Sequence, residues 1–138
     1  MTSGIDIVLQ AQIPSGKNQV RTLYAVEKDG RKVPRKIPDA RFVFWRELAG
    51  HEILEQRALW PAQFKKRLAQ PVRLLISYHP LDNRVRDLPG MLDALFHLMV
   101  WTNILADDRW IRGVHWDYLN RTDGPCVKMR LEVCEESA

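Results

Sequence analysis

The segment PCVKMRLEVC, residues 125–134, decides the fold class of this chain. Apolar and polar residues alternate along it. A strand with this pattern packs one face on a core and turns the other to solvent, as in antiparallel and mixed sheets. The side chains expected to face the core are Val127, Met129, Leu131 and Val133. Those expected to face outward are Cys126, Lys128, Arg130, Glu132 and Cys134.

Outward from this strand, the hydrophobic pattern predicts the remaining elements of one small domain. The predicted strands are residues 5–13, 72–78 and 111–119, the last forming a hairpin with 125–134. Helices are predicted over residues 40–57, with Asp39 as N-cap, and 88–102, with Asp87 as N-cap. We therefore expect an α+β (mixed α/β) class, with about four strands in a mixed sheet packed with two or three helices.

Two further segments are polar and basic. Residues 19–38 contain Gly30, Pro34 and Pro38 and are interpreted as a long loop that includes a short hairpin turning at residues 28–31. Long loops in compact domains are functional or disordered. Pro61 predicts the start of a short helix that carries the basic run at residues 65–67.

Length and composition limit the class of protein. With 138 residues the chain has the size of one domain, so residues 1–138 are predicted to form a single unit. The sequence shows neither an apolar run of membrane-spanning length nor the pattern of a signal peptide, which predicts a cytoplasmic protein. Cys126 and Cys134 are expected on one strand about 26 Å apart, which predicts free thiols.

The charge is distributed unevenly. The net charge is +4, and the largest basic cluster lies between residues 17 and 41. Its members are Lys17, Arg21, Lys28, Arg31, Lys32, Arg35, Lys36 and Arg41. A basic surface that attracts phosphates, beside a local group of acids that holds a metal, is what a metal-dependent nuclease requires. A solvated basic loop with no partner is the alternative.

Acids gather in the second half of the chain, at Asp82, Asp87, Asp93, Asp107 and Asp108. Clustered carboxylates are the oxygen ligands that Mg²⁺ prefers, and Arg84 and Arg86 lie close by in the sequence. The structural alternatives are an N-cap for Asp87 and a turn for Asp107 and Asp108. Because the predicted helix spans about 22 Å, residues 104–106 must return toward its start if Asp108 is to meet Asp87.

The segments RDLPGMLDAL, residues 86–95, and ADDRWI, residues 106–111, resemble the RusA family of Holliday junction resolvases. That family has an acid-rich strand end, a helix containing Asp-Ala-Leu, and a loop ending in Asp-Asp before a strand. Residues 13–18, IPSGKN, resemble the family's proline-rich basic segment, so the resemblance covers nearly the whole chain as a single RusA-like nuclease domain. It implies a Mg²⁺-dependent endonuclease (Mn²⁺ as a possible substitute) that cuts branched DNA as a homodimer in recombination and repair, associated with the nucleoid.

The resemblance departs from the family at its first acids, where Asp-x-Asp-Asn and a following lysine are usual. Alignment without gaps from Asp93 places Asn83 and Val85 at the two acids. Matching Asp82-Asn83 instead places Arg86 at the lysine, and matching residues 86–88 makes Asp87 the first acid. Arginine at this position differs from the family's lysine, because a planar guanidinium is not equivalent to a compact ammonium charge.

We favour a site in which Asp82, Asp87 and Asp108 are catalytic with Arg86 as the cationic group. The predicted metal ligands are Asp82, Asp87, Asp93, Asp107 and Asp108. The predicted DNA-binding residues are Lys17, Arg21, Arg31, Lys32, Arg35, Lys36 and Arg84. The predicted helix at 88–102 is apolar on more than one face, which independently favours a homodimer. A non-catalytic DNA-binding protein on the same scaffold is the main alternative, and an RNA-directed or general nuclease a third.

Overall fold

A computed structural model describes residues 3–14, 20–26, 28–38, 40–82, 87–120 and 124–134. The strands are β1 (Gly4–Leu9), β2 (Val20–Val26), β3 (Lys32–Pro38), β4 (Val72–Tyr78), β5 (Ile111–Tyr118) and β6 (Val127–Val133). The helices are α1 (Ala40–Arg57) and α2 (Leu88–Trp101), with short 3₁₀ turns η2 (Ala62–Phe64) and η3 (Asp108–Trp110).

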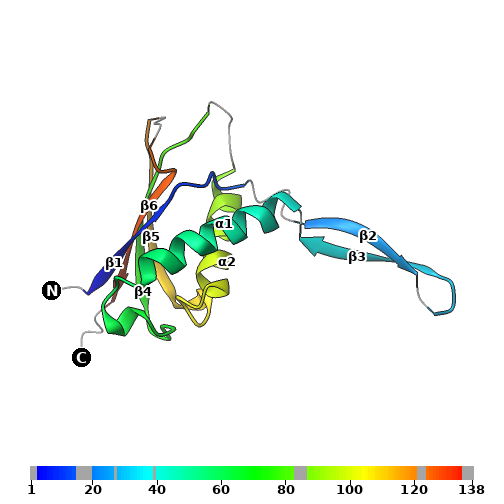
Figure 1. Ribbon diagram of the computed structural model, residues 1–138, viewed down its shortest axis with the longest axis horizontal. Coiled ribbons are helices and arrows are strands. Elements are labelled where there is room, and N and C mark those ends of the chain that lie inside the picture. Colours follow the sequence, from blue (N-terminus) through cyan, green and yellow to red (C-terminus); the bar gives the residue numbers. More distant parts are fainter. Residues whose placement is uncertain are drawn as a thin grey trace.

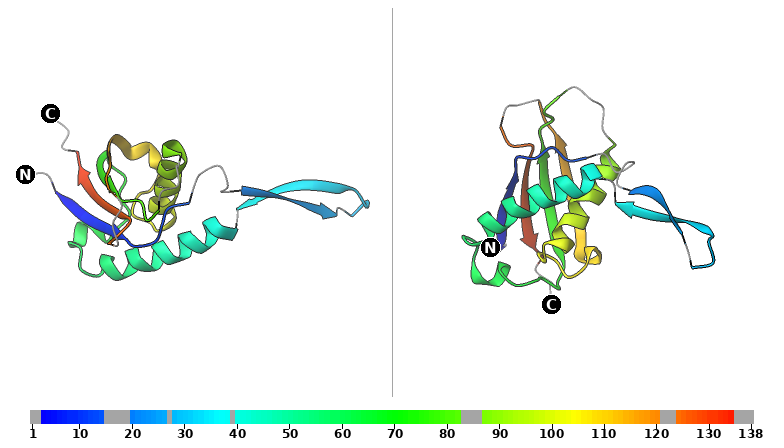
Figure 2. Two further views of the ribbon diagram at one scale, coloured as in Figure 1. Left: turned by 90° about the horizontal axis from the view of Figure 1, so that it is seen from above. Right: turned by 45° about the vertical axis from the view of Figure 1, so that its right-hand side comes forward.

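A four-stranded mixed sheet forms the centre of the molecule. Its strand order is β1-β6-β4-β5, with β6 antiparallel to both neighbours and β4 parallel to β5. Both α-helices lie on one face of this sheet (Figure 1; Figure 2). The α+β class and the four-stranded mixed sheet with two packed helices are therefore confirmed. No helix in the described ranges has the length and apolarity needed to cross a membrane.

The predicted hairpin between residues 111–119 and 125–134 is wrong. In the structure β4 lies between β5 and β6 and pairs with both. The strand β4 has alternate residues fully buried, so it occupies the centre of the sheet. Because α2 carries the chain back along the sheet after β4, the next strand, β5, runs parallel to β4.

Three smaller predictions are also corrected. The first strand ends at Leu9 rather than at residue 13. The helix predicted after Pro61 is the three-residue turn η2, and the basic run at 65–67 lies beyond it. Cys126 and Glu132 are buried, although both were expected to face outward. Glu132 tolerates burial because its carboxylate accepts from Arg73, with 2.9 Å between Nη2 and Oε1. Cys126 precedes β6 and so lies outside the strand's alternation.

Other details agree with the sequence. Ile5, Ile7 and Leu9 are buried, as are Val127, Met129 and Leu131, and Val133 is half-buried. The core-facing alternation of β1 and β6 is thus confirmed. Both cysteines are free thiols, as expected.

The helix α1 closes the β1 edge of the sheet. The side chain of Gln56 accepts a hydrogen bond from the Val8 N–H at 2.8 Å and donates one to the Val8 carbonyl at 2.6 Å. The Glu52 carboxylate accepts from the Gln10 N–H at 3.0 Å. These side chains take the place of a neighbouring strand, so this edge cannot easily pair with another chain.

The strands β2 and β3 form a separate two-stranded sheet that projects from the body (Figure 1). The pairing runs from Val20 opposite Pro38 to Val26 opposite Lys32. Gly30 has a φ of 84°, which a tight turn requires and glycine adopts without strain. Asp29 accepts from the Arg31 N–H at 3.1 Å and stabilises the same turn. The long loop predicted for residues 19–38 is therefore wrong, and the hairpin expected to turn at residues 28–31 is present and extends over nearly the whole segment.

Candidate functional site

Two of the predicted site residues lie at the carboxyl end of β4. Asp82 follows this strand by four residues and Asp87 is the N-cap of α2. Both are half-buried. The Asp87 side chain makes no capping hydrogen bond, and Pro89 stands in the first turn, where its missing N–H costs nothing. The N-cap position predicted for Asp87 is confirmed, and its carboxylate is not used for capping.

Asp107 and Asp108 lie at the opposite end of the sheet. The segment before them is held to Leu68, which donates to the Ile104 carbonyl at 2.9 Å and accepts from the Ala106 N–H at 2.8 Å. Val72, at the start of β4, is level with Ile111 at the start of β5. Residues 104–106 therefore do not return toward the start of α2, and Asp107 and Asp108 lie beside the amino end of β4.

Asp87 and Asp108 are consequently separated within one chain. The helix α2 has 14 residues, a length of about 21 Å, and the two acids lie beyond its two ends. Asp93 lies between them on the helix and is exposed. Within the described part of the chain, no three His, Cys, Asp or Glu residues come together as a group that could hold a metal ion.

The carboxylate of Asp107 is already engaged. It accepts from the backbone N–H of Arg109 at 2.8 Å and so caps η3. This hydrogen bond lowers the pKa of Asp107, and the neighbouring Asp108 and Arg109 lower the pKa further. Asp107 is therefore ionised at neutral pH, while Asp108 beside it is exposed. A pair of adjacent carboxylates of this kind can contribute oxygen ligands to a hard cation.

Several predicted residues lie outside the described parts of the chain: Lys17, Arg84 and Arg86. Arg21, Arg35 and Lys36 occupy positions in the hairpin strands, and Arg31 and Lys32 are exposed near its turn. The basic residues predicted to bind DNA are thus spread along the projecting hairpin rather than along an irregular loop.

The hairpin joins the body on the side where α2 begins. Strand β3 ends at Pro38 and α1 begins at Ala40. Phe42, in the first turn of α1, contacts His97 edge-on at 5.1 Å between ring centroids. Figure 2 shows the base of the hairpin on the same side of the molecule as the first turns of α2. The basic hairpin and the acids at the start of α2 therefore lie on one side.

His97 is exposed on α2, where Arg46 of α1 contacts it. Its Nε2 lies 3.2 Å from Nη1 of Arg46, and the Arg46 guanidinium lies over the Trp101 ring at 4.6 Å. Burial lowers the pKa of His97, and the Arg46 charge lowers it further. A neutral imidazole that accepts from Arg46 links α1 to α2.

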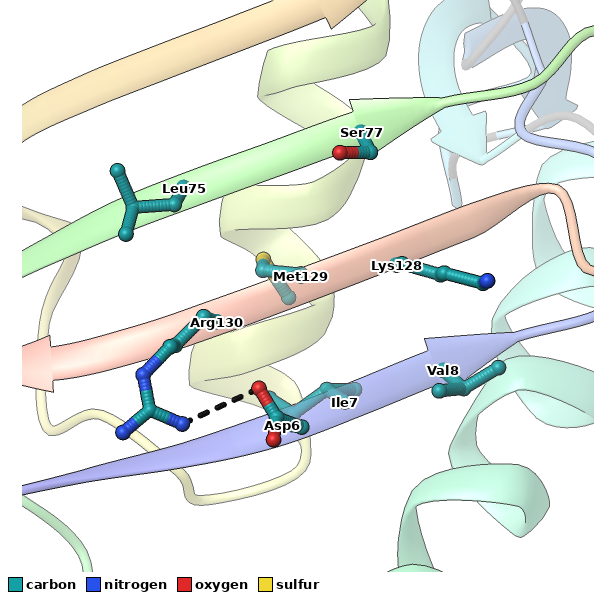
Figure 3. Close-up of a pocket in the computed structure, with 8 residues that line it drawn as sticks. All are labelled: Asp6, Ile7, Val8, Leu75, Ser77, Lys128, Met129 and Arg130. Atoms are coloured by element: carbon teal, nitrogen blue, oxygen red, sulfur yellow. Dashed lines mark hydrogen bonds and ion pairs between the residues drawn. The ribbon is translucent and has the colours of Figure 1, made fainter.

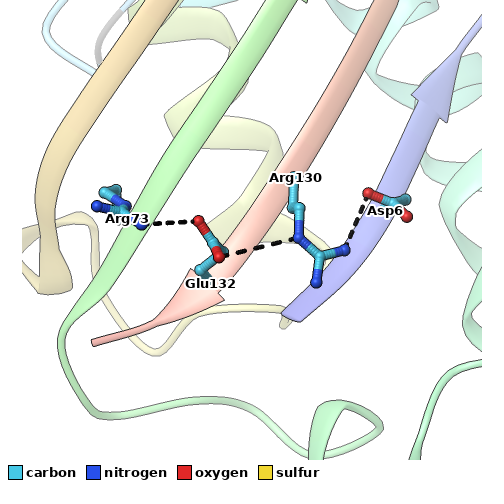
Figure 4. A network of polar contacts seen from close by, with 4 residues as sticks. All are labelled: Asp6, Arg73, Arg130 and Glu132. Atoms are coloured by element: carbon cyan, nitrogen blue, oxygen red, sulfur yellow. Dashed lines mark hydrogen bonds and ion pairs between the residues drawn. The ribbon is translucent and has the colours of Figure 1, made fainter. Parts of the chain in front are cut away.

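The open face of the sheet is a second polar surface, and it forms a shallow hollow over β1, β6 and β4 (Figure 3). Its two carboxylates, Asp6 and Glu132, each contact an arginine. Arg130 contacts Asp6 at 3.2 Å and Glu132 at 3.9 Å, and Glu132 also contacts Arg73 (Figure 4). Since each of these carboxylates contacts an arginine, the described part of this face offers no convergent acids for a metal, although Lys128 also lines the hollow.

The sequence interpretation missed one feature. The unpaired side of β5 carries apolar residues that remain exposed: Val114 is 40% exposed and Tyr118 is 55% exposed. The alternation of apolar residues in 111–118 is visible in the sequence. The expected hairpin, however, paired this strand with residues 125–134 and so left no open edge to predict.

Comparison with protein-family models gives no match for this chain, and comparison with curated protein sequences finds no relative.

Proposed function

We propose that the protein is a metal-dependent endonuclease that cleaves branched DNA, such as four-way junctions, as a homodimer. The observation that carries the proposal is the placement of a basic projecting hairpin on the side of the molecule where α2 begins with Asp87. A cationic arm binds phosphates without regard to sequence, and carboxylates at its base provide a site for hydrolysis. The resemblance of residues 86–95 and 106–111 to the RusA family supports the same activity.

The separation of the acids determines how such a site is built. Asp87 and Asp108 lie beyond opposite ends of α2, so one chain does not bring them together. In a two-fold dimer with antiparallel α2 helices, Asp87 of each chain lies near Asp108 of the partner copy. Two equivalent sites then form, each with acids from both chains, which suits paired incisions in a four-way junction.

The residue types at these positions fit a magnesium ion. Asp82 and Asp87 from one chain, with Asp107 and Asp108 from the other, would supply carboxylate oxygens, and Mg²⁺ needs only a few of these because it retains water. When bound, the metal polarises a phosphodiester oxygen and lowers the pKa of a bound water. The chain's own contribution is to orient the carboxylates and to hold DNA through the hairpin.

The test is a cleavage assay on a labelled four-way junction with and without Mg²⁺. We expect symmetric cuts only with the metal. Asp87→Asn and Asp108→Asn should each abolish cutting while junction binding survives, because each removes a ligand and also reduces repulsion of the DNA. Glu55→Gln, at an exposed position of α1 outside the hairpin and the acidic site, is the control and should cut like the wild type. Near wild-type cutting by either site variant would refute the assignment.

A non-catalytic DNA-binding protein is the second candidate. The observation that favours it is the same separation of Asp87 and Asp108 within one chain. Junction binding that is independent of Mg²⁺, unchanged in both aspartate variants and never followed by cleavage, would establish it.

A further inference from the structure

The two edges of the main sheet differ in whether side chains cover their backbone groups. At the β1 edge, Gln56 and Glu52 of α1 occupy backbone groups of Val8 and Gln10. At the β5 edge, no side chain among the described residues makes comparable hydrogen bonds to residues 111–118. An eight-residue edge strand whose outer backbone groups have no partner in the described ranges is a template for pairing with another strand.

The surface beside this open edge is apolar. Val114, Trp116 and Tyr118 alternate on the helix side of β5, level with the buried Leu74, Ile76 and Tyr78 of β4. Leu92, Phe96 and Val100 recur every four residues on α2, pack against the core and are half-buried. We call these six residues the β5 edge surface. A helix stripe next to an open strand edge is a typical interface for a second sheet and helix.

The polar side chains on the other face of β5 indicate which partner fits. His115 and Asp117 share the outer face of the strand, and their side chains are 3.2 Å apart. In an antiparallel pair of identical strands, opposite residues share a face. If the two-fold axis passes beside Trp116, His115 of each copy lies opposite Asp117 of the other copy. If the axis passes beside His115, the two histidines oppose each other, which gains nothing.

We propose that β5 pairs antiparallel with β5 of a second copy, centred on Trp116, to form a continuous sheet across the dimer. Val114 then lies opposite Tyr118 of the second copy, and the two β5 edge surfaces cover each other. The self-complementary pattern of β5 favours a copy of this chain over DNA, since an imidazole and a carboxylate that can hydrogen-bond to each other flank the axis on the outer face of the strand.

This interface deepens the proposed function. Its role in bringing acids of two chains together rests on that proposed function. Antiparallel pairing places the amino end of β5, next to Asp108, beside the carboxyl end of the second β5. The carboxyl ends of β4 and β5 lie level, and Asp82 follows β4. The pairing therefore carries Asp108 of one chain toward Asp82 and Asp87 of the other.

Disulfide trapping tests the register. Opposite residues on paired strands have Cα atoms about 5 Å apart, within disulfide range. In a Cys134→Ser background, Val114→Cys combined with Tyr118→Cys should give a covalent dimer on mild oxidation. Each single substitution should not, because 114 and its own copy are about 13 Å apart in this register. Cross-linking of the singles as readily as the double, or no cross-linking at all, would overturn the proposal.

A second measurement covers a failure of the cysteine variants to fold. Val114→Lys should shift the mass measured by light scattering from a dimer to a single chain, while its thermal melt remains cooperative. Leu54→Lys, an equally polar change at an exposed position of α1, is the matched control and should remain a dimer. A dimer that persists in Val114→Lys would place the interface elsewhere. A cross-linked dimer without nuclease activity would refute only the proposed function, and junction cleavage without cross-linking would refute only this interface.

Discussion

Gln56 shows how one side chain can satisfy the backbone hydrogen-bonding groups of a sheet edge. Its carboxamide makes two hydrogen bonds to Val8, one as acceptor and one as donor, at 2.8 and 2.6 Å. It also donates to the Glu52 carbonyl within α1 at 3.0 Å. The same residue thus ties a helix to a strand and satisfies backbone groups that would otherwise face a neighbouring chain.

Gln56→Ala should destabilise the protein by about 1–2 kcal/mol, since it leaves a backbone donor and acceptor without their partner. Urea denaturation measures this change, and hydrogen exchange should show faster exchange at the Val8 amide. Glu55→Ala, at the exposed neighbouring position of α1, is the control. Equal stability of the two variants would show that water replaces Gln56 without cost.

His97 gives a prediction about pH. Its pKa in the folded protein lies below its ordinary value of 6.5, because of burial and then of Arg46. The unfolded chain therefore binds the proton more readily. The stability contributed by neutral His97 is present above 6.5 and is lost as the pH falls through and below that value.

As the pH falls from about 7 to about 5, the free energy of unfolding of the wild type should therefore decrease more steeply than that of His97→Gln. Denaturant titrations at several pH values test this. Leu54→Gln, which changes an exposed position of α1 without removing a titratable group, should leave the slope unchanged. If His97→Gln keeps the wild-type slope, another group is responsible.

At the scale of elements, hydrophobic periodicity predicted most of the main-sheet elements but not all pairings. Strand β4 and helix α1 have the predicted bounds, and α2 begins at Leu88 as expected. The pairing of β5 was wrong because alternation is a local property, whereas neighbours in a sheet depend on the path of α2. The full extent of the hairpin at residues 19–38 was not predicted because its strands lack a clear alternation and contain Pro34 and Pro38.

The β2–β3 hairpin leads to a prediction about DNA binding. An isolated two-stranded sheet is marginally stable because it has no core of its own. Its basic residues are therefore interpreted as binding groups rather than packing groups. Neutralising Lys32, Arg35 and Lys36 together to Gln should weaken binding to four-way and linear DNA alike. The slope of log K against log salt should become less steep by about two to three.

Lys65, Lys66 and Arg67 provide the matched control, because they form another basic run outside the hairpin. Their triple replacement by Gln removes the same charge and should change the salt slope less. A slope unaffected by the hairpin variant would place the DNA-binding surface on another part of the molecule.

At the scale of the whole molecule, the position of the acids follows from topology rather than from local sequence. The sequence placed Asp87 at a helix start and Asp107 and Asp108 before a strand, and the structure has them there. The sequence left open whether residues 104–106 return to Asp87. Hydrogen bonds to Leu68, more than thirty residues earlier, hold this segment at the far end of α2. Long-range contacts of this kind have no local signal.

This arrangement predicts complementation between two inactive variants. In a dimer of Asp87→Asn with Asp108→Asn, one site receives both substitutions and the other receives intact Asp87 and Asp108. If the sites are shared between chains, mixing the two inactive proteins after mild denaturation and refolding should restore cutting. Random pairing gives about half heterodimers with one intact site each, so about a quarter of wild-type sites return.

The products distinguish this outcome from leakage. A heterodimer with one intact site should nick a junction in one strand and leave the opposite strand uncut, whereas the wild type cuts both. Each variant refolded alone is the control and should remain inactive. If each site were built within one chain, every heterodimer would carry one substitution in each site, and mixing would restore nothing. Absence of nicking in a mixture shown to contain heterodimers would therefore exclude the shared site, whatever the interface that joins the chains.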